Sequence, residues 1–519
     1  MNARRGAAGL PLRGPARSRS TWPAGLEGLL ALVLGAAQTW AFARPAAAWL
    51  LPAVTLLLLL WRLDGAAPRR AAWLGWCYGT GWLAAGTWWL FISMNRYGGL
   101  PAPLAVGAVL ALSAALSIYL AAACAGYARW QRGKGWDVAL FAALWFLAEW
   151  ARGVIFTGFP WLALGYAFVD SPVAALAPWV GVYGMGAFVA AASLAAWRLV
   201  HTRGQAWRPA VAVGAVMTAT LLAPTEFTRP AGVMSVALLQ TNISQDEKFA
   251  TDRMPEALAW ISRELLVARA DLVLAPETAV PLLPDQLADF APGYWQTLQK
   301  HFRASGTAAL IGVPLGDYDK GYTNSVAGLS KAAEYRYDKH HLVPFGEFIP
   351  TGFRWFTAMM NIPLGDFARG LANPPSFAVG AQRVAPNICY EDLFGEELAR
   401  RFIDPARAPT VFANISNIAW FGPSDINEQH LHISRLRTLE FQRPMIRATN
   451  TGATAVIDFR GQVLAQLPPY TRGVLKGDVQ GRDGITPFAF WTARADLWPL
   501  VALALLIVGA FAFRPRPLD

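Results

Sequence analysis

Cysteine is scarce in this sequence, which has only Cys77, Cys124 and Cys389 in 519 residues. Three cysteines exclude the disulfide framework that holds many small secreted domains together. Cys77 and Cys124 lie in long apolar runs, where a thiol acts as a small hydrophobic side chain. Cys389 lies in a polar stretch, so it is the one cysteine with a candidate chemical role.

Charged residues are also few: they make up 15% of the chain, whereas soluble proteins carry about 25%. Together with 55% hydrophobic residues, this excludes an ordinary soluble protein and favours a membrane protein. The net charge of +11 indicates no nucleic-acid partner, because residues 1–229 carry 18 basic and 6 acidic side chains while residues 230–487 carry 24 and 26. The polar block is near neutral and shows no phosphate-binding patch.

Apolar runs of spanning length, about 20 residues, recur along the chain. We predict about eight spans, at 23–43, 46–62, 71–93, 102–127, 137–157, 172–197, 208–224 and 494–513. Lys and Arg gather in alternate loops, which predicts that both termini are cytoplasmic. We therefore expect three parts: a membrane domain with about seven spans, an extracytoplasmic domain, and a last span with a cytoplasmic tail. Their bounds are 1–228, 229–488 and 489–519.

Glu149 and Arg152, three residues apart in one span, are expected to pair inside the bundle.

Residues 230–487 form a polar block between the apolar runs. In this block, short strand-like runs alternate with helical stretches of mixed charge such as 254–269 and 427–443. This alternation predicts an α/β domain. The strand-like runs are Ser235–Gln240, Asp271–Ala275, Ala308–Val313, Val384–Ile388, Thr410–Asn414, Ile446–Thr449 and Ala453–Asp458.

Cys389 directly follows one of these runs and precedes a predicted helix. A strand-to-helix turn is a usual place for an exposed nucleophile. A free thiol is mostly protonated at neutral pH, so a catalytic cysteine needs a neighbouring base or positive charge. The alternative is a buried structural cysteine.

Glu277 and Lys339 are candidates for this base and this positive charge. Glu277 follows an apolar strand-like run, where burial makes a carboxyl group a usable general base; it could also be an acid at a helix N-terminus. Lys339 could stabilise an oxyanion or be a solvated surface charge. Glu347 lies beyond a Pro-Gly turn, from which it could return to orient Lys339 or Cys389.

Glu277, Lys339 and Cys389, in this order and context, resemble the Glu-Lys-Cys triad of the nitrilase superfamily. The spans before and after them narrow the resemblance to the apolipoprotein N-acyltransferase family. The motifs that carry it are His341–Pro350, Ile388–Glu391, Arg443–Pro444 with Arg447–Gly452, and Glu149–Gly153 with Phe156–Trp161.

The resemblance implies a polytopic α-helical membrane bundle with a nitrilase-like αββα sandwich domain. It implies Cys389 as nucleophile, Glu277 as base and Lys339 as oxyanion stabiliser, supported by Glu347, Tyr390 and Glu391. The expected donor is a phospholipid, and the expected acceptor is the α-amino group of the N-terminal diacylglyceryl-cysteine of an apolipoprotein. The expected location is the bacterial inner membrane, with the catalytic domain on the periplasmic side. We expect a monomer in contact with membrane lipids, without nucleic acid, cofactor or metal.

Other features leave alternatives open. Ala275 stands where the family often has Trp, and the apolar stretch 353–375 is either core packing or a flap that admits lipid. The histidines at 340, 341, 430 and 432 fit no zinc spacing. The same triad would also serve a membrane-bound amidase or lipid hydrolase with water as acceptor, and a non-enzymatic scaffold is a third reading. The residues expected to contact substrate are Phe249, Trp355, Phe356, Trp420 and Glu440.

Overall fold

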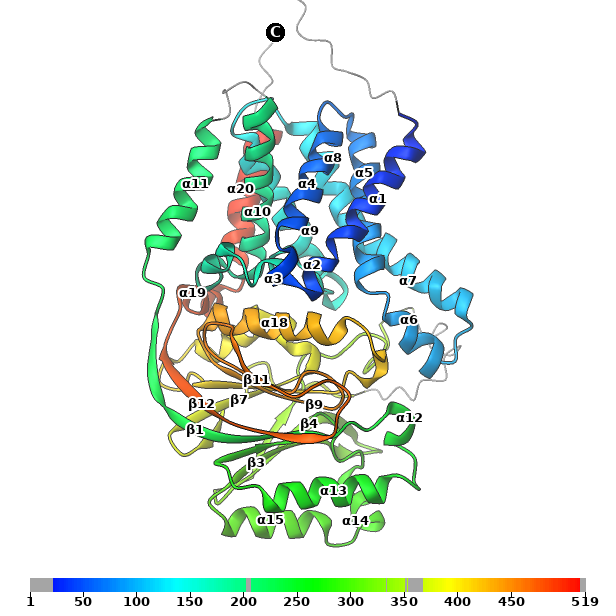
Figure 1. The fold of residues 1–519 in the computed structure, drawn as a ribbon, viewed down its shortest axis with the longest axis vertical. Coiled ribbons are helices and arrows are strands. Elements are labelled where there is room, and N and C mark those ends of the chain that lie inside the picture. Colours follow the sequence, from blue (N-terminus) through cyan, green and yellow to red (C-terminus); the bar gives the residue numbers. More distant parts are fainter. Residues whose placement is uncertain (1–21, 202–206, 333, 351, 353–366, 514–519) are drawn as a thin grey trace, which may run out of the picture.

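The computed structural model describes residues 22–201, 207–332, 334–350, 352 and 367–513. Helices gather at one end of the molecule and two sheets at the other, with α18 (Ile426–Phe441) between them (Figure 1). The first helix begins and the last helix ends at the far end of the bundle, away from the sheets (Figure 1). Trp355 and Phe356 lie outside the described residues.

The bundle is built from apolar helices that pack through small residues. A Cβ atom added at Gly35 would lie 1.9 Å from the Tyr78 carbonyl oxygen, and one at Gly81 would lie 2.0 Å from that of Leu32. Glycine therefore lets two of the helices approach closely, as is common in membrane bundles. The helices are α1 (Ala24–Gln38), α2 (Trp40–Ala43), α3 (Pro45–Ala48), α4 (Leu50–Leu63), α5 (Pro68–Gly86), α6 (Leu90–Ile92), α7 (Ala102–Leu116), α8 (Ile118–Trp130), α9 (Asp137–Val154), α10 (Ala177–His201), α11 (Trp207–Leu222), α19 (Pro487–Ala495) and α20 (Trp498–Ala512).

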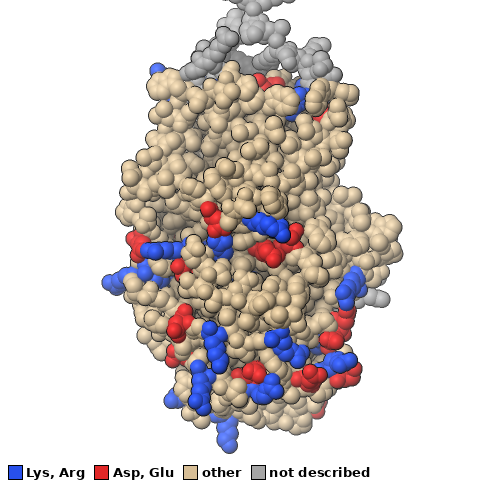
Figure 2. Space-filling model, in the orientation of Figure 1, with Lys and Arg blue, Asp and Glu red and all other residues tan. Residues whose placement is uncertain are grey.

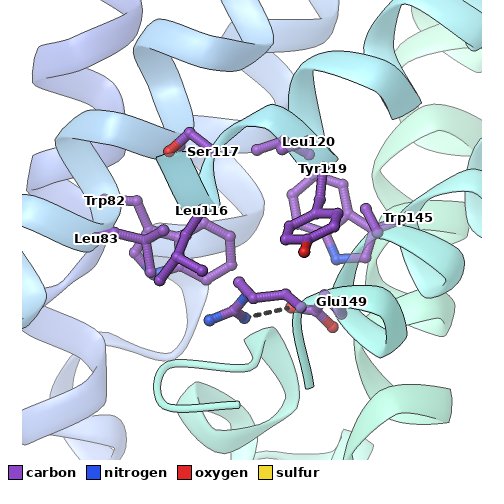
Figure 3. Close-up of a pocket in the computed structure, with 11 residues that line it drawn as sticks. Trp82, Leu83, Leu116, Ser117, Tyr119, Leu120, Trp145 and Glu149 are labelled. Atoms are coloured by element: carbon purple, nitrogen blue, oxygen red, sulfur yellow. Dashed lines mark ion pairs between the residues drawn. The ribbon is translucent and has the colours of Figure 1, made fainter. Parts of the chain in front are cut away.

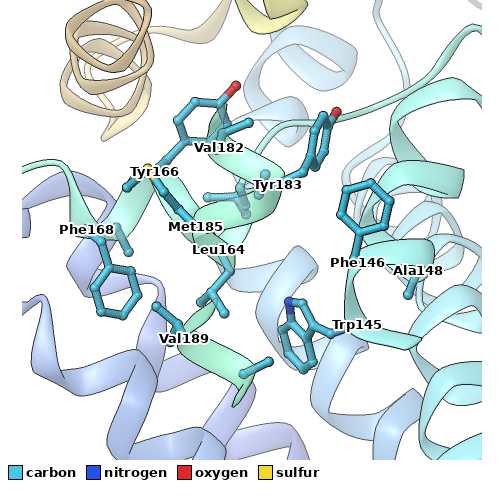
Figure 4. Close-up of a cluster of buried hydrophobic side chains, with 14 of the residues drawn as sticks. Trp145, Phe146, Ala148, Leu164, Tyr166, Phe168, Val182, Tyr183, Met185 and Val189 are labelled. Carbon is cyan, nitrogen blue, oxygen red and sulfur yellow. The ribbon is translucent and has the colours of Figure 1, made fainter. Parts of the chain in front are cut away.

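A core of buried apolar side chains lies between α9 and α10. Trp145 and Phe146 of α9 face Met185 and Val189 of α10 (Figure 4). The face of the bundle seen in Figure 2 is almost free of charge, whereas Lys, Arg, Asp and Glu gather over the sheets and at the far end of the bundle. This uncharged belt is the surface expected where helices meet hydrocarbon.

The prediction of eight membrane spans is too high for the described residues. Within the described residues, four helices are long and apolar enough to cross a membrane, and α19 with α20, bent by 83°, makes a fifth if the pair is one span. The 14 residues of α4 and 16 of α11 reach only about 21 and 24 Å at 1.5 Å per residue, less than the hydrocarbon thickness of about 30 Å. In α5, the pair Arg69 and Arg70 with several glycines lowers the mean hydropathy. The four helical spans are Ala24–Ala43, Ala102–Trp130, Asp137–Thr157 and Pro172–His201.

Two six-stranded sheets form the other end of the molecule, in the orders β12-β1-β2-β3-β4-β5 and β11-β10-β9-β8-β7-β6. β1, β2 and β3 are parallel, as are β7, β8 and β9, and the outer strands pair antiparallel. The strands are β1 (Thr228–Gln240), β2 (Leu272–Leu274), β3 (Ala308–Asp317), β4 (Gly321–Leu329), β5 (Tyr335–Asp338), β6 (Phe377–Val379), β7 (Gln382–Ile388), β8 (Val411–Ser416), β9 (Met445–Thr449), β10 (Ala455–Ile457), β11 (Val463–Gln466) and β12 (Gly473–Gly484).

The sheets stack face to face between two helical layers. Val236, Leu274, Ile388 and Ile446 belong to one buried cluster shared by both sheets. α13, α14 and α15 cover the outer face of the first sheet, and α18 covers the second on the side of the bundle (Figure 1). This confirms the α/β domain that the alternation of strands and helices predicts, and the αββα sandwich that the family resemblance implies. The remaining helices are α12 (Gln245–Lys248), α13 (Met254–Val267), α14 (Pro284–Phe290), α15 (Tyr294–Ala304) and α17 (Gly395–Ala399).

Candidate active site

The candidate catalytic residues all follow the carboxyl ends of strands. Glu277 comes three residues after β2, Lys339 directly after β5, and Cys389 directly after β7. β5 runs in the same direction as β2, because β3, β4 and β5 alternate in direction. Side chains that follow the ends of such strands gather at one edge of a sheet, and stacking brings the β7 end of the second sheet against it.

Glu277 is a buried carboxylate that is held by donors on both oxygens. Its Oε1 accepts a hydrogen bond from Asn324 Nδ2 at 2.7 Å, and its Oε2 accepts one from the backbone N–H of Asn417 at 2.7 Å. Lys339 Nζ lies 3.5 Å from Oε1. Two hydrogen-bond donors and a cation therefore surround the Glu277 carboxyl group.

Lys339 is an ammonium group enclosed by protein. Its side chain is 1% exposed, and Nζ donates to Glu347 Oε1 at 2.9 Å. Burial alone lowers the pKa of Lys339, but the negative charges of Glu347 and Glu277 outweigh burial and hold it above its ordinary value. Lys339 therefore stays charged, and a fixed charge at a buried site stabilises an oxyanion more strongly than a solvated one does.

Cys389 sits in a strained turn between β7 and the 3₁₀ helix η5 (Cys389–Leu393). Its φ of 52° is in the left-handed region, which a side chain with a Cβ adopts rarely and at a cost. The Cys389 carbonyl oxygen accepts a hydrogen bond from Asn414 Nδ2 at 3.3 Å. Burial and the charge of Glu277 raise the pKa of the thiol, while Lys339 opposes them. The resting side chain is thus a thiol.

The residues after Cys389 fix this turn in place. Glu391 accepts hydrogen bonds from the Tyr337 hydroxyl at 2.5 Å and from the backbone N–H groups of Ile388 and His340, each at 2.7 Å. It therefore joins the Cys389 turn to the loop that follows Lys339. Burial raises the pKa of Glu391, although these hydrogen bonds oppose the rise.

Tyr390 connects the turn to the helical bundle. Its hydroxyl donates to the Gly158 carbonyl oxygen at 3.0 Å. Arg152 Nη1 donates to the next carbonyls along that segment, Phe159 at 3.1 Å and Trp161 at 2.6 Å. Arg152 lies 3.9 Å from Glu149, which confirms the predicted pair within a pocket of the bundle (Figure 3).

Comparisons with known proteins identify the family of this chain. The family model of the apolipoprotein N-acyltransferase N-terminal domain matches residues 34–195, and that of carbon-nitrogen hydrolase matches residues 235–484. The apolipoprotein N-acyltransferase of Verminephrobacter eiseniae is 52% identical over 90% of this chain and 92% of its own length. That of Ralstonia nicotianae is 44% identical, over 94% and 93%. The chain belongs to the apolipoprotein N-acyltransferase family.

Membership in the apolipoprotein N-acyltransferase family confirms the resemblance that the motifs carry. It makes this chain an enzyme that transfers an acyl group to an apolipoprotein, and with the apolar helices it makes the chain a membrane protein. The carbon-nitrogen hydrolase match covers Glu277, Lys339 and Cys389.

The residues expected to contact substrate are scattered. Phe249 is 49% exposed at the end of α12. Trp420 packs edge to face on Tyr97 of the bundle, with ring centres 5.5 Å apart. Glu440 is fully buried and accepts a hydrogen bond from the Val182 backbone N–H at 2.8 Å, so the structure does not bring it into the Glu277 group.

Sequence reasoning misses three residues of the site. Asn324 and Asn417 hold Glu277, and Lys248 donates to its main chain. An isolated asparagine or lysine has no distinguishing sequence pattern. The available hint is that Lys248 precedes Phe249, one of the residues expected to contact substrate. Among the described residues, no three His, Cys, Asp or Glu side chains form a metal-binding group.

Proposed function

We propose that the acyl group comes from a phospholipid and passes through a thioester on Cys389. The final acceptor is the α-amino group of the diacylglyceryl-cysteine at an apolipoprotein N-terminus. The observation that carries this proposal is the convergence of three groups from three strand ends. Lys339 lies 3.5 Å from Glu277, and both residues act electrostatically on the Cys389 thiol. A base, a fixed cation and a thiol are the parts that covalent acyl transfer requires.

In the first half of the reaction, Glu277 takes the thiol proton and Cys389 Sγ attacks the ester carbonyl carbon. The resulting oxyanion forms beside the Lys339 ammonium group. When the tetrahedral intermediate collapses, the bond from carbon to the glycerol oxygen breaks. That oxygen takes the proton from Glu277, and a lysophospholipid leaves.

In the second half, the acceptor amine attacks the thioester carbonyl carbon. Glu277 accepts the amine proton, the carbon–sulfur bond breaks, and the proton passes to Cys389 Sγ. The products are an N-acyl amide and the restored thiol, so atoms and charge balance over the cycle. Because an amide is more stable than an ester, the overall exchange runs downhill.

We assign the catalytic part, residues 229–488, to the periplasmic side, with the membrane parts 1–228 and 489–519 holding it at the surface. The alternation of basic loops supports this orientation. So does the placement of the first and last described helices, whose outer ends lie far from the sheets (Figure 1). Both substrates are anchored in the membrane, so a tethered catalytic domain meets them at high effective concentration.

Mass spectrometry of the intact protein tests the proposal. Incubation with phospholipid alone should add one acyl group to Cys389, and a diacylated peptide should then remove it as the N-acylated product. Cys389→Ala should gain no acyl group. Steady release of fatty acid without peptide would instead indicate a hydrolase with water as acceptor. An acyl thioester on the Cys389→Ala protein would refute the nucleophile.

A further inference from the structure

His430 is a buried histidine beside the proposed nucleophile that the mechanism above does not use. It lies on α18 and is fully buried. Its Nε2 lies 3.2 Å from the Cys389 carbonyl oxygen and 2.9 Å from Asp392 Oδ1. Asp392 comes three residues after Cys389 in η5. One ring nitrogen of His430 therefore contacts the turn that carries the nucleophile at two points.

The partners of the His430 ring determine which nitrogen carries the hydrogen. Nδ1 lies 3.2 Å from Arg447 Nη2. A guanidinium group only donates hydrogen bonds, so Nδ1 must accept, and the hydrogen of the ring is on Nε2. The Nε2–H group is consequently a donor shared between the Cys389 carbonyl oxygen and the Asp392 carboxylate.

Asp392 and Arg447 hold the ring in this orientation. Both are fully buried, with Arg447 Nη1 3.4 Å from Asp392 Oδ2, and the Ser434 hydroxyl also donates to Oδ2. Burial alone raises the pKa of Asp392, but the contacts with His430, Arg447 and Ser434 outweigh burial and hold it below its ordinary value. Asp392 is thus a carboxylate, which can only accept hydrogen bonds, in agreement with a hydrogen on Nε2.

The Cys389 turn depends on outside support because it is strained. A left-handed φ of 52° in a residue with a Cβ persists only where the surroundings hold it. The Cys389 carbonyl oxygen accepts from two side chains, Asn414 Nδ2 at 3.3 Å and His430 Nε2 at 3.2 Å. Asn414 belongs to β8, whereas His430 comes from the helix on the side of the bundle. Without His430, the carbonyl would be held from the sheet alone.

α18 also ties this turn to the bundle. Gln429, the residue before His430, accepts hydrogen bonds from Trp161 Nε1 at 2.7 Å and from Trp89 Nε1 at 3.2 Å. The ring centres of Trp161 and His430 are 5.8 Å apart. Successive residues of one helix therefore bind the bundle and the Cys389 turn. These contacts fix the place of the nucleophile relative to the part of the protein that lies in the membrane.

We propose that His430 is a positioning residue for Cys389: its Nε2–H group holds the Cys389 carbonyl oxygen and so keeps Sγ where it can attack a lipid ester beside Lys339. This inference rests on the proposed function, in which Cys389 is the nucleophile. It predicts that the rate of acylation depends on a donor at the place of Nε2, whereas the binding of lipid does not.

Two substitutions separate this donor from the rest of the ring. His430→Gln places an amide N–H group at the distance of Nε2, so it should acylate close to the wild-type rate. His430→Asn places a shorter amide where Nδ1 lies, so it keeps an acceptor for Arg447 but does not reach Cys389. Its single-turnover acylation by phospholipid vesicles should be about 10²-fold slower, the effect of moving a catalytic group by about 1 Å. The vesicle concentration that gives half the maximal rate should not change.

The matched control is His432→Asn, on the same helix. His432 also faces a main-chain carbonyl, but its Nε2 lies 3.3 Å from the oxygen of Ala43 in the bundle. This variant should acylate at the wild-type rate. Ser434→Ala is a smaller change, which removes one donor to Asp392, and it should slow acylation to a lesser degree than His430→Asn. Thermal unfolding in detergent gives a temperature at which all variants are folded.

A His430→Asn protein that acylates as fast as wild type would overturn the inference. So would a His430→Gln protein that is as slow as His430→Asn, because the shape of the ring rather than its donor would then matter. If His430→Asn does not fold, a wild-type rate in Ser434→Ala counts against the inference in its place. If the wild type forms no thioester, the proposed function fails and the inference falls with it. A wild type that acylates, with an unchanged His430→Asn rate, refutes the inference alone.

Discussion

Glu347, rather than the proposed base, is the closest carboxylate to Lys339. Lys339 Nζ lies 2.9 Å from Glu347 Oε1 and 3.5 Å from Glu277 Oε1. Asn324 Nδ2 donates to both carboxylates at 2.7 Å. The strongest partner of the ammonium group is thus a residue with no proton to move. Glu277 keeps a longer contact with Lys339.

Glu347→Gln should slow acyl-thioester formation while leaving the protein folded. Without the second carboxylate, Lys339 would move toward Glu277, away from the oxyanion position and onto the base. Misplacement of a catalytic group by about 1 Å costs roughly 10²-fold in rate. The measurement is single-turnover acylation followed by intact-protein mass spectrometry.

The matched control is Glu334→Gln, a glutamate in the same domain whose side chain is 55% exposed. It should acylate at the wild-type rate. A Glu347→Gln enzyme with an unchanged rate would mean that Lys339 is held without Glu347.

Local patterns predict much of the fold. The strand-like runs at 235–240, 308–313 and 384–388 lie in β1, β3 and β7, and the run at 271–275 contains β2, because apolar strand interiors are visible in the sequence. The edge strand β12 was not predicted, since Gly473–Gly484 mixes glycine with charged residues and is largely solvent-accessible. Its strand conformation depends on pairing with β1 across more than 200 residues.

The candidate site is likewise only partly predictable from the sequence. Glu277, Lys339 and Cys389 are found because each follows a strand within a recognisable motif. Asn324 and Asn417 are not, because they meet Glu277 from 47 and 140 residues away. The Asn324 contact depends on the order of strands within one sheet, where β4 lies two strands from β2, and the Asn417 contact depends on the stacking of the second sheet on the first, so no local pattern encodes either.

Glu277→Gln should have opposite effects on two reactions of Cys389. The negative charge of Glu277 helps to hold the thiol pKa above its ordinary value, so its removal lowers that pKa. The thiolate fraction between pH 7 and pH 9 then rises, by about tenfold for one pKa unit. Alkylation by iodoacetamide should become faster, while acylation by phospholipid, which needs the base, should become slower. Peptide mass spectrometry at Cys389 measures both rates.

Glu256→Gln, a 71% exposed site in the same domain, is the control and should change neither rate. The buried Cys77 and Cys124 serve as internal references, because their labelling should be the same in every variant. Slower alkylation in Glu277→Gln would contradict the assignment, since it would mean that Glu277 does not raise the thiol pKa.

Glu440, which the sequence predicts to contact substrate, makes structural contacts between α18 and the bundle instead. Its carboxylate pairs with Arg437 at 2.9 Å and accepts from the Val182 N–H of α10, so it fastens α18 to the bundle. Burial raises the pKa of Glu440 to about 7, with Arg437 opposing. Glu440→Ala would leave a buried guanidinium without its partner, which costs about 3 to 5 kcal/mol.

Thermal unfolding in detergent should therefore show a lower midpoint for Glu440→Ala, whereas Glu428→Ala, an exposed position on the same helix, should unfold as wild type. The KM for a diacylated peptide, measured at a temperature where both variants are folded, should match wild type. A raised KM with an unchanged unfolding midpoint would instead make Glu440 a substrate contact. The two outcomes differ because a residue that fastens two parts of the protein changes the free energy of unfolding, while a residue that contacts substrate changes the free energy of binding.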